Sequence, residues 1–457
     1  MELRRHPDFL RLWAGETISQ VGSQVTLLAV PFIAITLLEA STFQVGLLTA
    51  VEMSPFLLVG LPAGAIIDRL RRRPVMIAAD IGRALALVSI PLAHSFDVLT
   101  MAQLYVVVLA TGVLTVFFDV AYMAYLPSLV EPEQLVEGNA KLEVSRSGAQ
   151  VAGPAMGGGL VGWLGAATAV WIDAASFVVS ALALMGIRKP EAQPVRESDD
   201  AGVHVRMRTQ IAEGVRYVWR HPYLRPLACS TGTFNLFGTM GYSIILVFAV
   251  RELGVKAGQV GLILGIGNLG FLAGAALTAR VTARLGVGRT IWLSGLVSGL
   301  GPWLLAAATP STAVVMLVAG IAVGASGIPA YNINQVSLRQ AITPQRLQGR
   351  MHATMRFIVW GTMPLGGFLG GALGTLIGLR PTLIVSAAGS TLAFLWVLFS
   401  PVAGVREMPS GGDGEEAGHP LPGVGGIGAS VSGPIGIVDE PVAGLGVHDD
   451  LDVRQPP

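Results

Sequence analysis

Three carboxylates inside long apolar stretches are the residues of this sequence best suited to chemistry. Glu16, Glu52 and Asp119 each lie in a run of mostly apolar residues. An ionised group at the centre of a membrane helix costs at least about 2.5 kcal/mol, so it faces a cavity or a partner. Because carboxylates exchange protons, we expect proton coupling at these three positions. For Glu52, which lies nearer the outer end of its run, contact with water is an alternative.

Three arginines in similar surroundings, Arg83, Arg146 and Arg356, form a second set of candidates. Glu16 or Asp119 could form a salt bridge with Arg83 or Arg146, and an acid held in this way would not exchange protons. Both readings stay open for the two acids. The second half of the chain offers Arg356 no nearby acid, so it binds carbonyls, reaches across to the first half or meets an anionic substrate.

Apolar runs of about 20 residues make up most of the chain and must position these groups. Charged residues are only 13% of the 457 residues, and the mean hydropathy is +0.63. This composition predicts an all-α membrane protein with about twelve transmembrane helices. The runs cover approximately 12–37, 43–67, 74–96, 99–126, 143–165, 167–187, 223–251, 257–283, 289–308, 311–338, 349–377 and 380–401.

Basic residues mark alternate turns between the runs, which predicts the orientation of the chain. Arginines gather before residue 12, at 69–73, in 188–222, at 280–289 and at 339–350. By the positive-inside rule, both termini lie in the cytoplasm of a multi-pass cell-membrane protein. We expect six-helix bundles at 1–187 and 223–401, a cytoplasmic linker with an amphipathic helix at 188–222 and a disordered cytoplasmic tail at 402–457.

Sequence patterns of the first half recur in the second, which indicates a duplication. Arg146, Pro154 and Gly157 recur 210 positions later as Arg356, Pro364 and Gly367, and the tripeptide at 45–47 recurs at 260–262. Two parallel, homologous six-helix halves are a transporter architecture, with substrate held near the midplane between them. The positions in the second copy that correspond to the acids at 16, 52 and 119 hold uncharged residues. We therefore expect proton coupling to lie in the first half.

Polar and aromatic residues in the apolar runs are candidates for lining a substrate cavity. A large apolar cavity with a few polar groups suits amphipathic small molecules. Asn and Gln also join neighbouring helices inside membranes, so that role is the alternative for each amide. The candidates are Asn235, Asn268, Tyr331, Asn332, Asn334, Gln335 and Trp360.

The loop between the second and third runs carries the first family signature. Gly64, Asp68, Arg69, Arg72 and Arg73 resemble the loop motif of the major facilitator superfamily, in which Gly is followed by Asp-Arg and basic residues. The sequence departs from that motif at 71, where Arg replaces the usual Gly. The resemblance implies that these residues gate the cytoplasmic side.

The glycine-rich helix carries the second signature. The segment Gly153, Pro154, Ala155, Met156, Gly157, Gly158, with Gly148 upstream, resembles the fifth-helix motif of drug/proton antiporters in that superfamily. Residues 9–13, 119–146 and 331–335 further resemble the macrolide-efflux and enterobactin-exporter-like group. The resemblance implies export, with the helices of Glu16 and Asp119 lining the cavity and those of Arg83, Asp80 and Asp173 at the periphery.

Several functions are excluded by what the sequence lacks. Cys229 is the single cysteine, and no phosphate-binding glycine loop or nucleophile constellation occurs, so we expect no enzyme, cofactor or metal site. A net charge of +1 argues against nucleic acid. The expected partners of a monomeric protein are the lipid bilayer, protons and a small-molecule substrate. A proton-independent facilitator or importer of the same fold and a non-transporting sensor are the alternatives.

Overall fold

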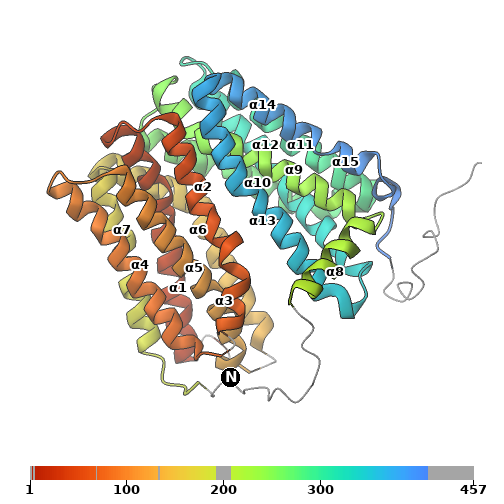
Figure 1. Ribbon diagram of the computed structural model, residues 1–457, viewed down its shortest axis with the longest axis horizontal. Helices are drawn as coiled ribbons and strands as arrows, with labels where there is room; N and C mark the ends of the chain where they lie inside the picture. The colour runs from red at the N-terminus through yellow and green to blue at the C-terminus, as the bar shows by residue number, and fades with distance from the viewer. Residues whose placement is uncertain (1–2, 4–5, 68, 132–133, 192–206, 410–457) are drawn as a thin grey trace, which may run out of the picture. The chain divides into compact units, whose positions relative to one another are not determined.

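The computed structural model describes residues 3, 6–67, 69–131, 134–191 and 207–409, and these residues form helices joined by short turns (Figure 1). The elements are α1 (Pro7–Phe32), the π-helical η2 (Ile33–Leu37), α2 (Thr42–Leu58), α3 (Gly60–Ile67), α4 (Arg72–Ser95), α5 (Met101–Leu129), α6 (Leu135–Leu164), α7 (Ala166–Met185), α8 (Met207–Arg220), α9 (Leu224–Arg251), α10 (Ala257–Leu285), α11 (Val287–Ala307), α12 (Ala313–Ala341), α13 (Gln345–Leu376), α14 (Leu379–Leu392), α15 (Leu395–Leu398) and the 3₁₀ helix η4 (Pro401–Gly404).

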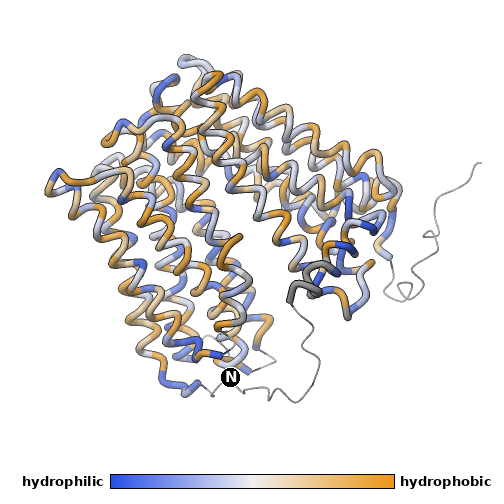
Figure 2. Tube along the Cα trace, in the orientation of Figure 1, coloured by the Kyte–Doolittle hydropathy of each residue, from blue (hydrophilic) through white to orange (hydrophobic). Residues whose placement is uncertain are grey.

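Ten helices within the described ranges are long and apolar enough to cross a membrane. The helix α2, with 17 residues, is shorter, and α6 carries several charged residues in its first turns. The described residues form helices throughout, so the predicted all-α membrane fold is confirmed. The prediction of about twelve spans stays a prediction, which α2 and α6 would complete. Hydrophobic residues cover the helices and hydrophilic residues gather in α8 and near helix ends (Figure 2).

The two halves form two groups of helices. In the first, α1 packs on α6 and α7, and α4 packs on α5 and α7. In the second, α9 packs on α13 and α14, and α11 packs on α12 and α14. The groups meet where α2 packs on α13 and α6 on α10 (Figure 1). We call the end that carries Arg72 and Arg289 the basic end, and the end where α2 and α10 begin the opposite end.

Two predicted helices have different limits in the structure. The run predicted at 43–67 divides at Val59, because Pro55 and Gly60 interrupt regular helix formation on either side of it. The helix predicted at 143–165 begins earlier, at Leu135. Its added turns are polar and are stabilised by an ion pair of 2.7 Å between Lys141 and Glu137.

The expected tail begins later than 402. In η4 the side chain of Val402 is buried, and the carbonyls of Val405 and Arg406 accept hydrogen bonds from the first amides of α11. Residues 402–406 therefore complete the second bundle. The rest of the tail from 410, and residues 192–206 of the linker, lie outside the described residues.

Candidate functional site

The glycine-rich part of α6 packs between α1 on one side and α10 on the other. A Cβ on Gly157 would lie 2.9 Å from the Gln24 carbonyl oxygen of α1, and one on Gly153 would overlap the Gln24 side chain. A Cβ on Gly158 would lie 2.7 Å from the main-chain nitrogen of Gly261 in α10. We call the contact of Gly158 with Gly261 the first seam. Small residues here let the helices approach closely.

A second seam joins α2 of the first half to α13 of the second. A Cβ on Gly46 would lie 2.5 Å from the main-chain nitrogen of Gly371, and one on Gly367 would lie 2.9 Å from that of Ala50. Both seams lie nearer the opposite end. The sequence analysis did not single out Gly46, Gly261 or Gly371 as site residues, although the repeated tripeptides at 45–47 and 260–262 contain two of them.

The predicted motif residue Gly148 differs from its neighbours. A Cβ there would meet no atom within 4 Å, whereas Gly153, Gly157 and Gly158 are all in close contact. The main-chain oxygen of Pro154 lies against Gly261. The close-packed part of the motif is therefore 153–158.

Glu16 is buried in the first bundle. Its Oε1 accepts a hydrogen bond of 2.7 Å from Gln20, whereas Oε2 is buried and has no hydrogen-bond partner. Asp119 of α5 and Arg83 of α4 are within electrostatic reach of Glu16. Tyr122, one turn after Asp119, interacts electrostatically with both acids. The structure thus brings Glu16 and Asp119 together, and adds a tyrosine that the sequence analysis did not identify.

Arg83 pairs with Asp80 rather than with Glu16 or Asp119. It forms a buried ion pair with Asp80, and its guanidinium carbon lies 4.4 Å and 4.1 Å from the ring centres of Phe118 and Phe177. Asp173, on α7, is also buried and accepts a hydrogen bond of 3.1 Å from Ser176. These groups join α4, α5 and α7 inside the bundle.

Asp119 has no ion pair with an arginine among the residues that the structure describes. Arg146, the other candidate partner, lies 4.0 Å from Glu143, and these two side chains are 55% and 64% exposed. The fixed ion pairs that were an alternative for Glu16 and Asp119 are therefore not formed in this conformation.

Glu52 and Arg356 both lie close to the contact between the halves. Glu52 is within electrostatic reach of Tyr242 in α9. One turn further along α2, Phe56 meets Trp360 edge to face, with ring centres 4.5 Å apart. The guanidinium of Arg356 lies 5.9 Å from the Trp360 ring centre, which is within the range of a cation–π contact.

Several residues predicted to line a substrate cavity instead join helices of the second bundle. Asn334 and Gln335 are 2% and 4% exposed, and Asn334 hydrogen-bonds Thr282 of α10. Tyr331 hydrogen-bonds Thr231 at 2.8 Å. The contacts of Asn334 favour its alternative role of joining helices. The side-chain oxygen of Gln335 is buried without a hydrogen-bond partner, and the place of Gln335 in a substrate cavity stays a prediction.

The remaining amides differ from one another. Asn235 donates to the Val359 carbonyl at 3.2 Å and so joins α9 to α13. Asn268 donates across the halves to the Gln150 carbonyl at 3.2 Å. Asn332 is exposed. Of the three, Asn268 lies directly at the contact between α6 and α10.

The predicted gating loop is held to the end of its own bundle. Asp68 lies outside the described residues, Gly64 is in α3 and Arg69 is exposed. The amides of Arg72 and Arg73 donate to the carboxylate of Glu191 at 2.7 Å and 3.1 Å. Glu191, which the sequence analysis did not identify, therefore caps the start of α4.

The same helix end is built differently in the second half. Arg71 precedes α4 with a φ of −68°, whereas Gly286 precedes α11 with a φ of 82°. Only the second conformation favours glycine. The departure from the superfamily motif at 71 therefore causes no strain in this structure.

Comparison with known proteins identifies the relatives of this chain. Residues 3–437 match the family described as transmembrane secretion effector, within the major facilitator superfamily. The chain belongs to this family. As a transmembrane secretion effector it is a membrane transporter rather than an enzyme, so both the predicted resemblance and the predicted lack of enzymatic function are confirmed.

Two curated relatives of this transmembrane secretion effector are named as exporters. The multidrug efflux pump Tap of Mycolicibacterium fortuitum is 28% identical over 418 residues, which cover 87% of this chain and 96% of Tap. The enterobactin exporter EntS of Salmonella choleraesuis (strain SC-B67) is 25% identical over 410 residues, which cover 88% of this chain and 94% of EntS.

Solved structures of other transporters have the same fold as this family member. The nucleoside transporter NupG superposes with a TM-score of 0.68 at 13% identity, over 87% of this chain and 98% of NupG. A bacterial homologue of the iron transporter ferroportin in an inward-facing state gives 0.66 at 18% identity, over 87% and 98%. At these identities, the similarity shows the fold alone.

Proposed function

We propose that this transmembrane secretion effector exports small amphipathic molecules from the cell by proton antiport. The named exporters Tap and EntS support the direction of transport. The observation that carries the proposal is the pair of seams, in which Gly158 meets Gly261 and Gly46 meets Gly371. Each half contributes one glycine to each seam, so the two bundles can separate there as rigid bodies.

The orientation follows from the basic residues. With the basic end in the cytoplasm and both termini inside the cell, the seams lie toward the outer face of the cell membrane. Near the basic end, Val136 and Val144 of α6 are 81% and 72% exposed. We propose that this conformation is closed on the outer side and accessible from the cytoplasm. Export then requires the seams to part while the basic end, with Arg69 to Arg73, closes.

Proton coupling is proposed at Glu16 and Asp119. Oε2 of Glu16 has no hydrogen-bond partner, and Asp119 forms no ion pair among the described residues, so each carboxylate can accept a proton without breaking an ion pair. Protonation would remove negative charge from the first bundle and favour the conformation in which these acids are least hydrated. Release of the protons to the cytoplasm would complete the antiport cycle.

Substrate contact is proposed at the aromatic cluster between the halves. Phe56 and Trp360 come from different halves, and Arg356 adds a positive charge beside Trp360. Rings of this kind bind apolar surface, and the guanidinium binds a polar group of the same molecule. An amphipathic compound matches both parts of the cluster.

Drug accumulation tests this proposal. In a host that lacks its own pumps, we expect wild type to lower accumulation of compounds from a broad amphipathic panel, and Glu16→Gln and Asp119→Asn to restore it. Collapse of the proton gradient should have the same effect on wild type. If the strains with wild type, Glu16→Gln and Asp119→Asn all accumulate as much compound as the host without this protein, export is refuted. Export that is insensitive to the gradient and to both substitutions would instead support the proton-independent facilitator.

A further inference from the structure

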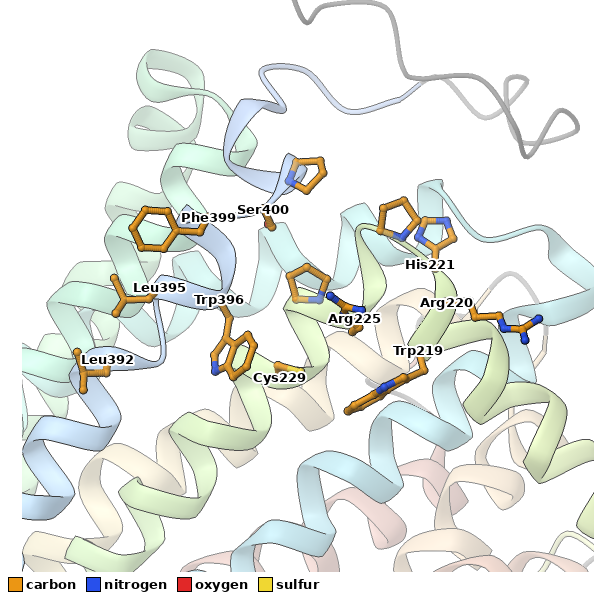
Figure 3. Close-up of a pocket in the computed structure, with 13 residues that line it drawn as sticks. Trp219, Arg220, His221, Arg225, Cys229, Leu392, Leu395, Trp396, Phe399 and Ser400 are labelled. Carbon is orange, nitrogen blue, oxygen red and sulfur yellow. The ribbon is translucent and has the colours of Figure 1, made fainter.

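A groove beside the linker helix is separate from the contact between the halves. It has a volume of about 750 Å³ and lies between the end of α8, the start of α9 and the α14–α15 region (Figure 3). Its lining includes Trp219 from α8, Arg225 and Cys229 from α9, and Trp396 from α15. In Figure 3, Arg225 and Cys229 lie between the two tryptophans.

One wall of the groove is apolar and exposed among the residues that the structure describes. Trp219 is 53% exposed, Trp396 50% and Phe399 83%. Leu392 and Leu395 continue this surface along the last helices. Exposed tryptophan at the end of a membrane helix is typical of the level where lipid headgroups meet acyl chains.

The other wall is basic and unpaired. Arg220 and Arg225 are exposed, and neither forms an ion pair among the described residues. None of the residues that line the groove is an aspartate or glutamate. The two guanidinium groups are therefore available to an anion that enters from outside the protein.

His221 contributes a neutral edge to the basic wall. Its Nδ1 accepts hydrogen bonds from the amides of Tyr223 at 3.3 Å and Leu224 at 3.4 Å, so it caps the start of α9. Partial burial lowers the pKa of His221 below its ordinary value. The positive charge of the groove thus comes from the two arginines.

We infer that this groove binds an anionic phospholipid of the cytoplasmic leaflet, with the phosphate at Arg220 and Arg225 and the acyl chains along Trp396 and Phe399. The inference rests on the orientation proposed above, which places the basic end in the cytoplasm. A basic pocket between helices on the cytoplasmic side is suited to lipid headgroups. The lipid would join α8 of the linker to α15, and so link the connection between the halves to the second bundle.

The single cysteine provides the test, because Cys229 lies in the groove. The full-length protein is placed in nanodiscs of phosphatidylcholine, with or without phosphatidylglycerol, and the rate of alkylation by neutral N-ethylmaleimide is measured. For wild type, we expect phosphatidylglycerol to slow alkylation about fivefold or more. The ratio of rates in the two lipids corrects for changes in the intrinsic reactivity of the thiol.

Matched variants locate the effect. The double variant Arg220→Gln/Arg225→Gln should lose the protection and retain roughly tenfold less phosphatidylglycerol on purification, as counted by mass spectrometry. Arg220→Lys/Arg225→Lys should keep most of it. The double variant Arg284→Gln/Arg289→Gln removes the same charge from exposed positions outside the groove and should behave as wild type.

Other outcomes overturn the inference. Equal loss of lipid in the two glutamine variants would show general attraction to charge without a site. Protection by inorganic phosphate in phosphatidylcholine nanodiscs, as strong as that by phosphatidylglycerol, would show a site for a soluble anion. Because these measurements need no transport, a negative result leaves export untouched, and a failed transport assay leaves the lipid site untouched.

Discussion

The two halves of this transporter share their packing and differ in their polar interiors. Glycine seams, helix order and the capped first turns of α4 and α11 are present in both. The first half buries Glu16, Asp80 and Asp173, whereas the second is joined by neutral contacts such as Thr282 with Asn334. The duplication therefore preserved the surfaces on which the halves meet, while the buried acids of the described residues lie in the first half.

The largest effect should come from the buried ion pair of the first half. Asp80→Asn leaves Arg83 buried without its acid, which should lower the free energy of unfolding by about 3–5 kcal/mol. Thermal unfolding of the purified protein measures this. Glu143→Gln, which removes the acid of the exposed pair with Arg146, should change stability by no more than about 1 kcal/mol. Equal shifts would mean that the buried pair has no special role.

The next effect should come from the seams, and it should be equal in the two seams. Gly158→Ala and Gly46→Ala each place a methyl group against main-chain atoms of the facing helix, which should cost about 1–3 kcal/mol in the conformation described here. We expect both to reduce export at unchanged expression, as measured by drug accumulation. Gly148→Ala, where the methyl group meets open space, is the control and should transport normally.

A smaller effect should distinguish the two capped helix ends. Glu191→Ala removes the carboxylate that accepts from two amides of α4, which should cost about 0.5–2 kcal/mol. Arg406 stands 215 positions after Glu191, and there the caps on α11 are main-chain carbonyls. Arg406→Ala should therefore leave the thermal midpoint unchanged. A comparable drop in both variants would contradict the structural difference between the two ends.

The smallest effect should come from the neutral network of the second half. Asn334→Ala removes its hydrogen bonds to Thr282 and to the Ala330 carbonyl, and such contacts inside membranes contribute about 0.6 kcal/mol on average. We expect a slightly lower thermal midpoint and an unchanged profile of exported compounds. A changed profile of exported compounds would instead indicate that Asn334 contacts the substrate.

The fold could be predicted from the sequence because hydropathy and the repeat each report on whole helices. The helix limits at Val59 and Leu135 could not be predicted in this way. The first depends on a local break in the helix, and the second on polar turns added before the apolar run. The motif around Gly158 gave one side of a seam. Its partner Gly261 lies in the repeated tripeptide at 260–262, but only the three-dimensional contacts show that it meets Gly158.

The candidate site was predictable by residue type but only partly by role. An acid inside a membrane helix costs free energy unless it has a role, so Glu16 and Asp119 could be chosen as site candidates from the sequence. Sequence distance could not show that Arg83 pairs with Asp80, or that Asn334 faces Thr282. Glu191 lies in a polar stretch where an acid is ordinary, and only its contacts with Arg72 and Arg73 distinguish it.

Substrate efflux driven by an imposed pH gradient in proteoliposomes tests the central claim most directly, namely that proton exchange occurs at the acids of the first half. We predict that the gradient accelerates transport by wild type and by Thr231→Val, the substitution at the position in the second half that corresponds to Glu16. Glu16→Gln and Asp119→Asn should lose this response and keep substrate exchange without a gradient. A full response to the gradient in both acid variants would contradict the claim.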